Sequence, residues 1–205
     1  MRALSWLLSL TLLAPAGRII NFDSYKAGQT PPGWMVPDAA KGGSEWEIRA
    51  DLTAPTPPNV LVSGASVESR SQLAIFDAVN AKDADVSVRL KPVSGHEESG
   101  GVVWRYRDAN NYFAARANAR DNTVSIFKVE NGRREPVYSG VKHSIPVNSW
   151  SILKVSVRGA RIQVFLDHRR VLDAQDRSFS GVGKCGLWSP SDSTVYFDDF
   201  RVYPK

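Results

Sequence analysis

Aromatic and polar side chains that could bind a sugar are concentrated in the middle of the chain. Aromatic rings stack on the apolar faces of pyranoses, while arginine, asparagine and glutamine side chains hydrogen-bond to hydroxyl groups. Both kinds occur on strand-like runs, so one sheet face could collect them. We therefore expect a ligand site formed by Trp104, Arg105, Tyr106, Tyr112, Arg116, Asn118, Gln163 and Phe165. Alternating Trp and Phe residues are also typical of a core, and this alternative stays open.

Three aspartates are candidates for holding a metal ion. Asp198 and Asp199 are adjacent near the end of the chain, and together with Asp23 they could bind a hard cation such as Ca²⁺. Neighbouring residues on a regular strand point to opposite faces, so one of the pair could instead accept hydrogen bonds from a nearby loop. We favour this structural role over Ca²⁺ binding and expect no other cofactor.

The sequence contains neither an HExxH zinc motif nor a Walker-type phosphate-binding loop. His96, His143 and His168 are isolated, with no paired-His spacing that would suit a metal. Cys185 is the only cysteine, which excludes an intramolecular disulfide, and we expect it to be a small buried hydrophobic residue. A Ser-His-Asp arrangement stays open, because its members would come together only in space.

The elements that position these residues are predicted to be strands. Val102 to Tyr106, Tyr112 to Ala117 and Val124 to Val129 are rich in β-branched and aromatic residues and are separated by polar turns. Alternation would place Trp104 and Tyr106 on one side of the first strand. No stretch has a helical period over ten residues, so the sequence predicts about a dozen strands in an all-β, antiparallel β-sandwich of the jelly-roll type.

Length and charge indicate one folded domain, which we expect to span residues 17–205 as a monomer. The chain has 205 residues, a formal net charge of +5 and 23% charged residues. Its basic residues are scattered, with no block longer than Arg133-Arg134 or Arg169-Arg170, which argues against nucleic acid as a partner.

The N-terminus has the pattern of a secretory signal peptide over residues 1–16. Met1-Arg2 is followed by an apolar run from Leu4 to Leu13 and by the small-residue segment Ala14-Pro15-Ala16. The apolar run is too short to span a bilayer, so we predict no membrane span. The expected location is secreted or periplasmic.

Several segments, in this order, carry a resemblance to a known family. They are Asn21-Phe22-Asp23 with Gly28 and Trp34, the run Gly101 to Tyr106 with Asp108 and Asn111-Tyr112, Trp150 to Val157 with Ile162 to Leu166, and Val195 to Val202. In these segments the chain resembles the concanavalin-A-like lectin/glucanase sandwiches, specifically the laminin-G-like and 3-keto-disaccharide hydrolase (DUF1080) group. The resemblance implies two curved antiparallel sheets with a sugar-binding concave face, and for Arg105 it implies contact with substrate oxygens.

Three functions follow as alternatives. Glycoside hydrolysis usually needs two carboxylates across the scissile bond, and the run Tyr112 to Ala117, where the keto-sugar hydrolases tend to have an acid, contains none. We therefore expect an exported, lectin-like module that binds a carbohydrate or glycan without catalysis. A glycoside hydrolase of the 3-keto-disaccharide type and a structural or protein-binding adhesion module are the alternatives.

Overall fold

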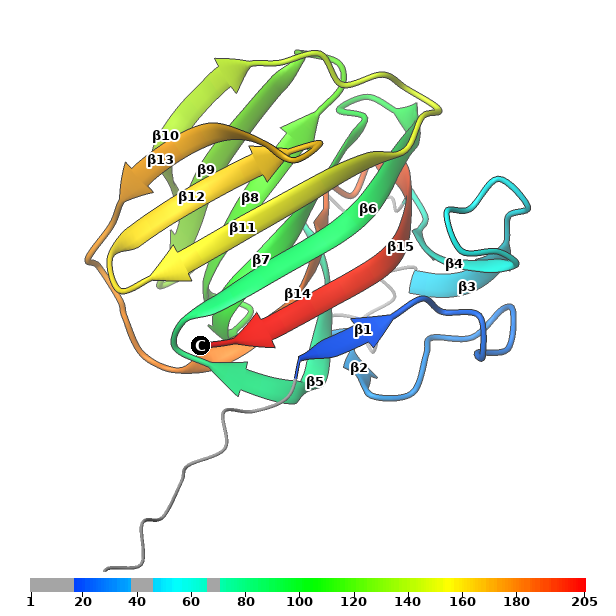
Figure 1. Cartoon of the computed structure of the whole chain (residues 1–205), viewed down its shortest axis with the longest axis horizontal. Helices are drawn as coiled ribbons and strands as arrows, with labels where there is room; N and C mark the ends of the chain where they lie inside the picture. The colour runs from blue at the N-terminus through cyan, green and yellow to red at the C-terminus, as the bar shows by residue number, and fades with distance from the viewer. Residues whose placement is uncertain (1–16, 38–45, 66–70) are drawn as a thin grey trace, which may run out of the picture.

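The computed structural model describes residues 17–37, 46–65 and 71–205. These residues form fifteen strands and no helix, arranged as two antiparallel sheets packed face to face (Figure 1). The described part of the chain thus has no helix that could cross a membrane. The predicted signal peptide lies outside the described residues. The prediction of an all-β, antiparallel β-sandwich is confirmed.

Sheet A has eight strands and lies in front in Figure 1. Its members are β1 (Arg18–Ile20), β3 (Trp46–Ala50), β4 (Asn59–Ser63), β6 (Ala84–Gly95), β11 (Ser151–Arg158), β12 (Arg161–Leu166), β13 (Arg169–Gln175) and β15 (Ser193–Pro204). Their order is β13-β12-β11-β6-β15-β4-β3, with β1 paired to β15.

Sheet B has seven strands and lies behind sheet A. Its members are β2 (Trp34–Met35), β5 (Gln72–Ala81), β7 (Ser99–Asp108), β8 (Asn111–Asn118), β9 (Thr123–Glu130), β10 (Arg133–Lys142) and β14 (Gly183–Ser189). Their order is β10-β9-β8-β7-β14-β5-β2, so the predicted meander is the run β7 to β10 at one side of the sheet. Asn131 and Gly132 both have positive φ, as the expected hairpin turn between β9 and β10 requires.

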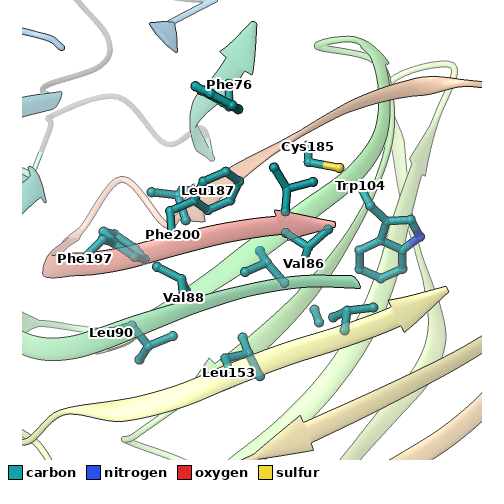
Figure 2. Close-up of a cluster of buried hydrophobic side chains, with 14 of the residues drawn as sticks. Phe76, Val86, Val88, Leu90, Trp104, Leu153, Cys185, Leu187, Phe197 and Phe200 are labelled. Atoms are coloured by element: carbon teal, nitrogen blue, oxygen red, sulfur yellow. The ribbon is translucent and has the colours of Figure 1, made fainter. Parts of the chain in front are cut away.

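The core lies between the sheets and consists of the inward residues of both. Figure 2 shows part of it, with Val86, Val88 and Leu90 of β6 against residues of β7, β11, β14 and β15. Full burial of such side chains contributes roughly 1.5–3 kcal/mol each. Cys185 belongs to this core, as predicted, and burial raises the pKa of its thiol to about 12.

A β-bulge at Arg105 breaks the regular alternation of β7. Arg105 has a φ of 50°, and the pairing of β7 with β8 is irregular between Trp104 and Asp108. As a result Trp104 lies in the core, while Tyr106 joins Val103 on the opposite side of the sheet. The prediction that Trp104 and Tyr106 share one side is therefore wrong, because regular alternation ends at the bulge.

A second bulge lies at Asp199 in β15. Asp199 has a φ of 50°, and the register of β15 with β6 shifts between Asp198 and Arg201. Phe197 and Phe200 both point into the core, so two residues rather than one lie between consecutive inward positions. The expectation that Asp198 and Asp199 point to opposite faces is thus also wrong, since both lie on the side of sheet A away from the core.

Candidate functional site

The outer face of sheet B, called here the B face, carries an unusual amount of apolar and aromatic surface. Alternation directs a second cluster of side chains away from the core: Leu73, Ile75, Val103, Tyr106, Tyr112, Ala114, Phe127, Val129 and Trp188. These residues are nearly inaccessible although they lie on an outer face; Trp188, for example, is 0% exposed. Other side chains must therefore cover them.

Arg134 of β10 covers two of these rings. Its guanidinium carbon lies 3.8 Å from the centre of the Phe127 ring and 5.4 Å from that of Trp188, and the two rings meet edge to face. Contact with the rings removes hydration from the guanidinium, and this burial, followed by the charge of nearby Arg116, lowers the pKa of Arg134. Such stacking fixes the plane of the guanidinium and leaves the N–H groups in that plane able to donate.

A depression of about 340 Å³ opens beside this stack, across β8, β9 and β10. Its lining consists of Arg116, Ser125, Ile126, Phe127, Arg134, Pro136, Tyr138 and Ser139. All eight are neutral or basic. The Tyr138 ring is 42% exposed and so is the aromatic surface that a ligand can reach.

Arg116 and Trp188 leave donors unused on the B face. One terminal nitrogen of Arg116 pairs with Glu97 at 2.9 Å. Within the described residues, however, the buried Nε of Arg116 and the indole nitrogen of Trp188 have no hydrogen-bond partner. Buried donors are normally paired with protein or water. These two donors are buried, so the guanidinium that a ligand can reach on the B face is that of Arg134, which is exposed, as is Tyr138.

The eight residues expected to bind a ligand are spread over different parts of the sandwich. Tyr106, Tyr112 and Arg116 are on the B face, where both tyrosines are buried in the apolar cluster. Gln163 and Phe165 lie on the outer face of sheet A, because their neighbours on β12 point into the core. The structure therefore does not bring the eight together at one surface.

The other three residues have structural surroundings. Trp104 stacks on Phe113 in the core at a centroid distance of 5.5 Å. The buried side chain of Asn118 accepts a hydrogen bond from the backbone of Asp121 in the turn between β8 and β9. Both are only 2% exposed, so neither is accessible to a ligand in this conformation.

Arg105 is held by more hydrogen bonds to the protein than the other predicted site residues. It is 1% exposed and donates to three backbone carbonyls: Lys82 at 3.0 Å, Phe179 at 3.3 Å and Gly159 at 2.6 Å. It also pairs with Asp83 at 3.2 Å. These contacts tie β7 to the connection from β5 to β6, to the hairpin turn between β11 and β12, and to the segment before β14.

The three aspartates considered for Ca²⁺ all have protein partners. Asp23 accepts hydrogen bonds from Asn21 and from the backbone of Asn59. Asp199 pairs with two arginines of sheet A. The described residues contain no group of three or more His, Cys, Asp or Glu side chains placed to hold a metal ion. Ca²⁺ binding stays the alternative to the favoured structural role.

Asp198 is fully buried, and its carboxylate accepts hydrogen bonds from the backbone and hydroxyl of Thr56, both at 2.9 Å, and from the Asp199 amide at 2.7 Å. Burial raises the pKa of this carboxyl group to about 6, and the three hydrogen bonds only partly oppose that effect. The side chain connects β15 to the loop before β4. This is the kind of structural role that the sequence analysis favoured.

Three residues of the B face were not anticipated: Phe127, Arg134 and Tyr138. Arg134 and Pro136 are two positions apart after the Asn131-Gly132 turn, so alternation could have indicated a shared face, whereas the register of β10 with β9 shifts between Pro136 and Tyr138. Nothing in the sequence indicated that this face carries the stack on Phe127, since the contact depends on the pairing of β9 with β10.

Comparisons with known proteins agree on the fold. No family model matches the chain. A levanase of Bacillus subtilis (strain 168) is 36% identical over 104 residues, which are 49% of this chain and 15% of the levanase. The chain thus spans only a small part of that relative.

Two solved structures are similar over most of the chain. The carbohydrate binding module CBM66 from Bacillus subtilis has a TM-score of 0.68 at 24% identity, covering 83% of this chain and 95% of the module. The cellulose induced protein Cip1 has a TM-score of 0.67 at 11% identity, covering 92% of this chain and 97% of Cip1. The chain therefore has the concanavalin-A-like β-sandwich fold that its sequence resembles.

Proposed function

We propose that the protein is a carbohydrate-binding module that holds a glycan on the B face without hydrolysing it. The observation that carries the proposal is the stacking of Arg134 on Phe127 at the edge of an open depression. A fixed guanidinium can donate to two neighbouring hydroxyl groups of a sugar at little cost in side-chain entropy.

The remaining lining residues suit the same ligand. The exposed ring of Tyr138 offers a surface for the apolar side of a sugar, while Ser125 and Ser139 can donate or accept hydrogen bonds. Hydrolysis of a glycoside usually needs two carboxylates, whereas the eight lining residues are neutral or basic. The lining therefore supports binding better than catalysis.

The relatives supply a first ligand to test. The names of the similar proteins are those of a levanase and of a carbohydrate binding module. We therefore propose levan as the first candidate. We further infer that the module acts as a monomer and after export. The inference of export rests on the apolar run from Leu4 to Leu13 and the small residues after it.

The test is a binding titration of levan oligosaccharides and other neutral glycans with the full chain, followed by analysis of the sugars recovered. Arg134→Ala should weaken binding about tenfold, since a hydrogen bond to a charged group contributes about 1.5–3 kcal/mol. Tyr138→Ala should weaken it as well.

Arg133→Ala is the matched control, because Arg133 is the exposed neighbour on the same strand and carries the same charge. If Arg133→Ala and Arg134→Ala weaken binding equally, the effect is one of net charge and the proposed site is wrong. Recovery of shortened oligosaccharides would instead establish an enzyme.

A further inference from the structure

The outer face of sheet A contains a second hollow, of about 320 Å³, on the opposite side of the sandwich from the B face. Four strands and one turn contribute its lining: Ser87, Val88, Arg89, Ile152, Lys154, Phe165, His168, Asp199 and Arg201. Ligand pockets have volumes from about 300 Å³ upward, so this hollow has room for one monosaccharide unit.

Two irregular backbone segments build the hollow. The bulge in β15 puts Asp199 on this face, next to Arg89 of β6. On the other side, Asp167 and His168 have φ values of 45° and 67° and form the tight turn between β12 and β13. The Asp167 carboxylate accepts a hydrogen bond from the Ile152 backbone at 2.7 Å, which fixes the turn over β11 and holds His168 at the rim.

Positive charge exceeds negative charge around the hollow. Arg89 and Arg201 share Asp199, at 3.1 and 3.5 Å. Lys154 pairs with Asp85, at 3.4 Å. That same carboxylate also pairs with Arg158 and Lys205. Within the described residues, five positively charged side chains thus pair with only two carboxylates. The side chains of the two arginines that line the hollow, Arg89 and Arg201, are about two-fifths exposed.

An aromatic ring lies beside these cations. Phe165 projects outward from β12, and the Lys154 ammonium lies 5.6 Å from the centre of its ring. Planar guanidinium groups bind carboxylate and phosphate oxygens through paired hydrogen bonds. A ligand that fits this hollow must combine an anionic oxygen group with a ring of the size of a sugar ring.

We propose that this hollow is a second binding site, which takes an acidic sugar unit. The carboxylate or phosphate group of the ligand binds the N–H groups of Arg89 and Arg201 that do not face Asp199, and its ring lies against Phe165. The site does not depend on the B face, and the module would therefore bind two chemically different glycan units on its two sides.

The test is calorimetric titration of the full chain with glucuronate, glucose 6-phosphate and glucose. We expect both acids to bind at least about tenfold more tightly than glucose, and salt to weaken their binding. Whichever acid binds more tightly identifies the carboxylate or the phosphate as the natural anionic group. Equal binding of glucose, or no binding of either acid, would overturn the proposal.

Variants locate the site. Arg201→Gln should weaken binding of the preferred acid about tenfold. Arg169→Gln removes the same charge from sheet A outside the lining and should have little effect. If Arg201→Gln does not fold, Phe165→Ala should still weaken binding about fivefold. Equal effects of Arg201→Gln and Arg169→Gln, or loss of this binding in Arg134→Ala on the B face, would refute the assignment.

Discussion

Replacing Arg105 with methionine should destabilise the sandwich without removing a ligand contact. The side chain is 1% exposed and makes four polar contacts, three with carbonyl oxygens and one with the carboxylate of Asp83. Methionine has a similar length and no β-branch, so it meets the same positive φ with a comparable strain. The substitution therefore isolates the loss of the guanidinium donors.

The expected loss of unfolding free energy is about 4 kcal/mol. Hydrogen bonds from a charged group contribute about 1.5–3 kcal/mol each, and the four would then sum to roughly 6–12 kcal/mol. Asp83 is 26% exposed and can be hydrated again, so the smaller figure of about 3–5 kcal/mol measured for broken buried ion pairs is more appropriate. For a chain of this size, that loss lowers the melting temperature by about 8–16 °C.

Urea unfolding followed by circular dichroism measures this change directly. Arg107→Met is the matched control, because Arg107 is exposed two residues further along β7 and its guanidinium carbon lies 5.1 Å from the centre of the Phe179 ring, a cation–π contact. It should lose less than about 1 kcal/mol. If the two variants lose the same amount, or if folded Arg105→Met no longer binds sugar while Arg107→Met does, the structural role assigned to Arg105 is wrong.

Two further predictions concern the aspartates of β15. The pKa of Asp198 is raised in the folded state to about 6, so its contribution to stability is present below about pH 4 and is lost as pH rises through about 6. Relative to Asp198→Asn, the wild type should therefore lose roughly 3 kcal/mol over this range, and a difference independent of pH, measured by urea unfolding, would contradict the burial argument. Removing Ca²⁺ with EDTA should leave the melting temperature unchanged, because the carboxylates of Asp23, Asp198 and Asp199 already bind protein donors. A fall in melting temperature that added Ca²⁺ reverses would establish a metal site.

Strands could be predicted from the sequence because their signals are local. In β11, Leu153, Val155 and Val157 alternate with polar residues, and the Asn131-Gly132 turn after β9 specifies a hairpin by itself. Such patterns need no knowledge of the partner strand. The sandwich architecture then follows, since a dozen or more short strands with one apolar face each must pack as two layers.

The two bulges could not be predicted, because distant contacts impose them. The partners of Arg105 lie 22 to 74 residues away in the sequence. Asp199 is likewise held by Arg89 of another strand. Non-glycine residues seldom have positive φ without such compensation. The bulge at Arg105 puts Trp104 in the core and Tyr106 on the B face, whereas Gln163 and Phe165 lie elsewhere because β12 belongs to sheet A.

The division between inward and outward positions explains how the fold and its ligand can vary separately. The core needs only the inward half of each strand, which is consistent with a TM-score of 0.68 to a binding module at 24% identity. Outward positions are free to carry other chemistry, and function therefore follows from them rather than from the fold. On sheet B these positions place Arg134 and Tyr138 at one depression, and on sheet A they place Arg89, Arg201 and Phe165 at another. Because the core separates the two surfaces, Arg134→Ala and Arg201→Gln should act additively when combined, each removing one class of glycan and sparing the other.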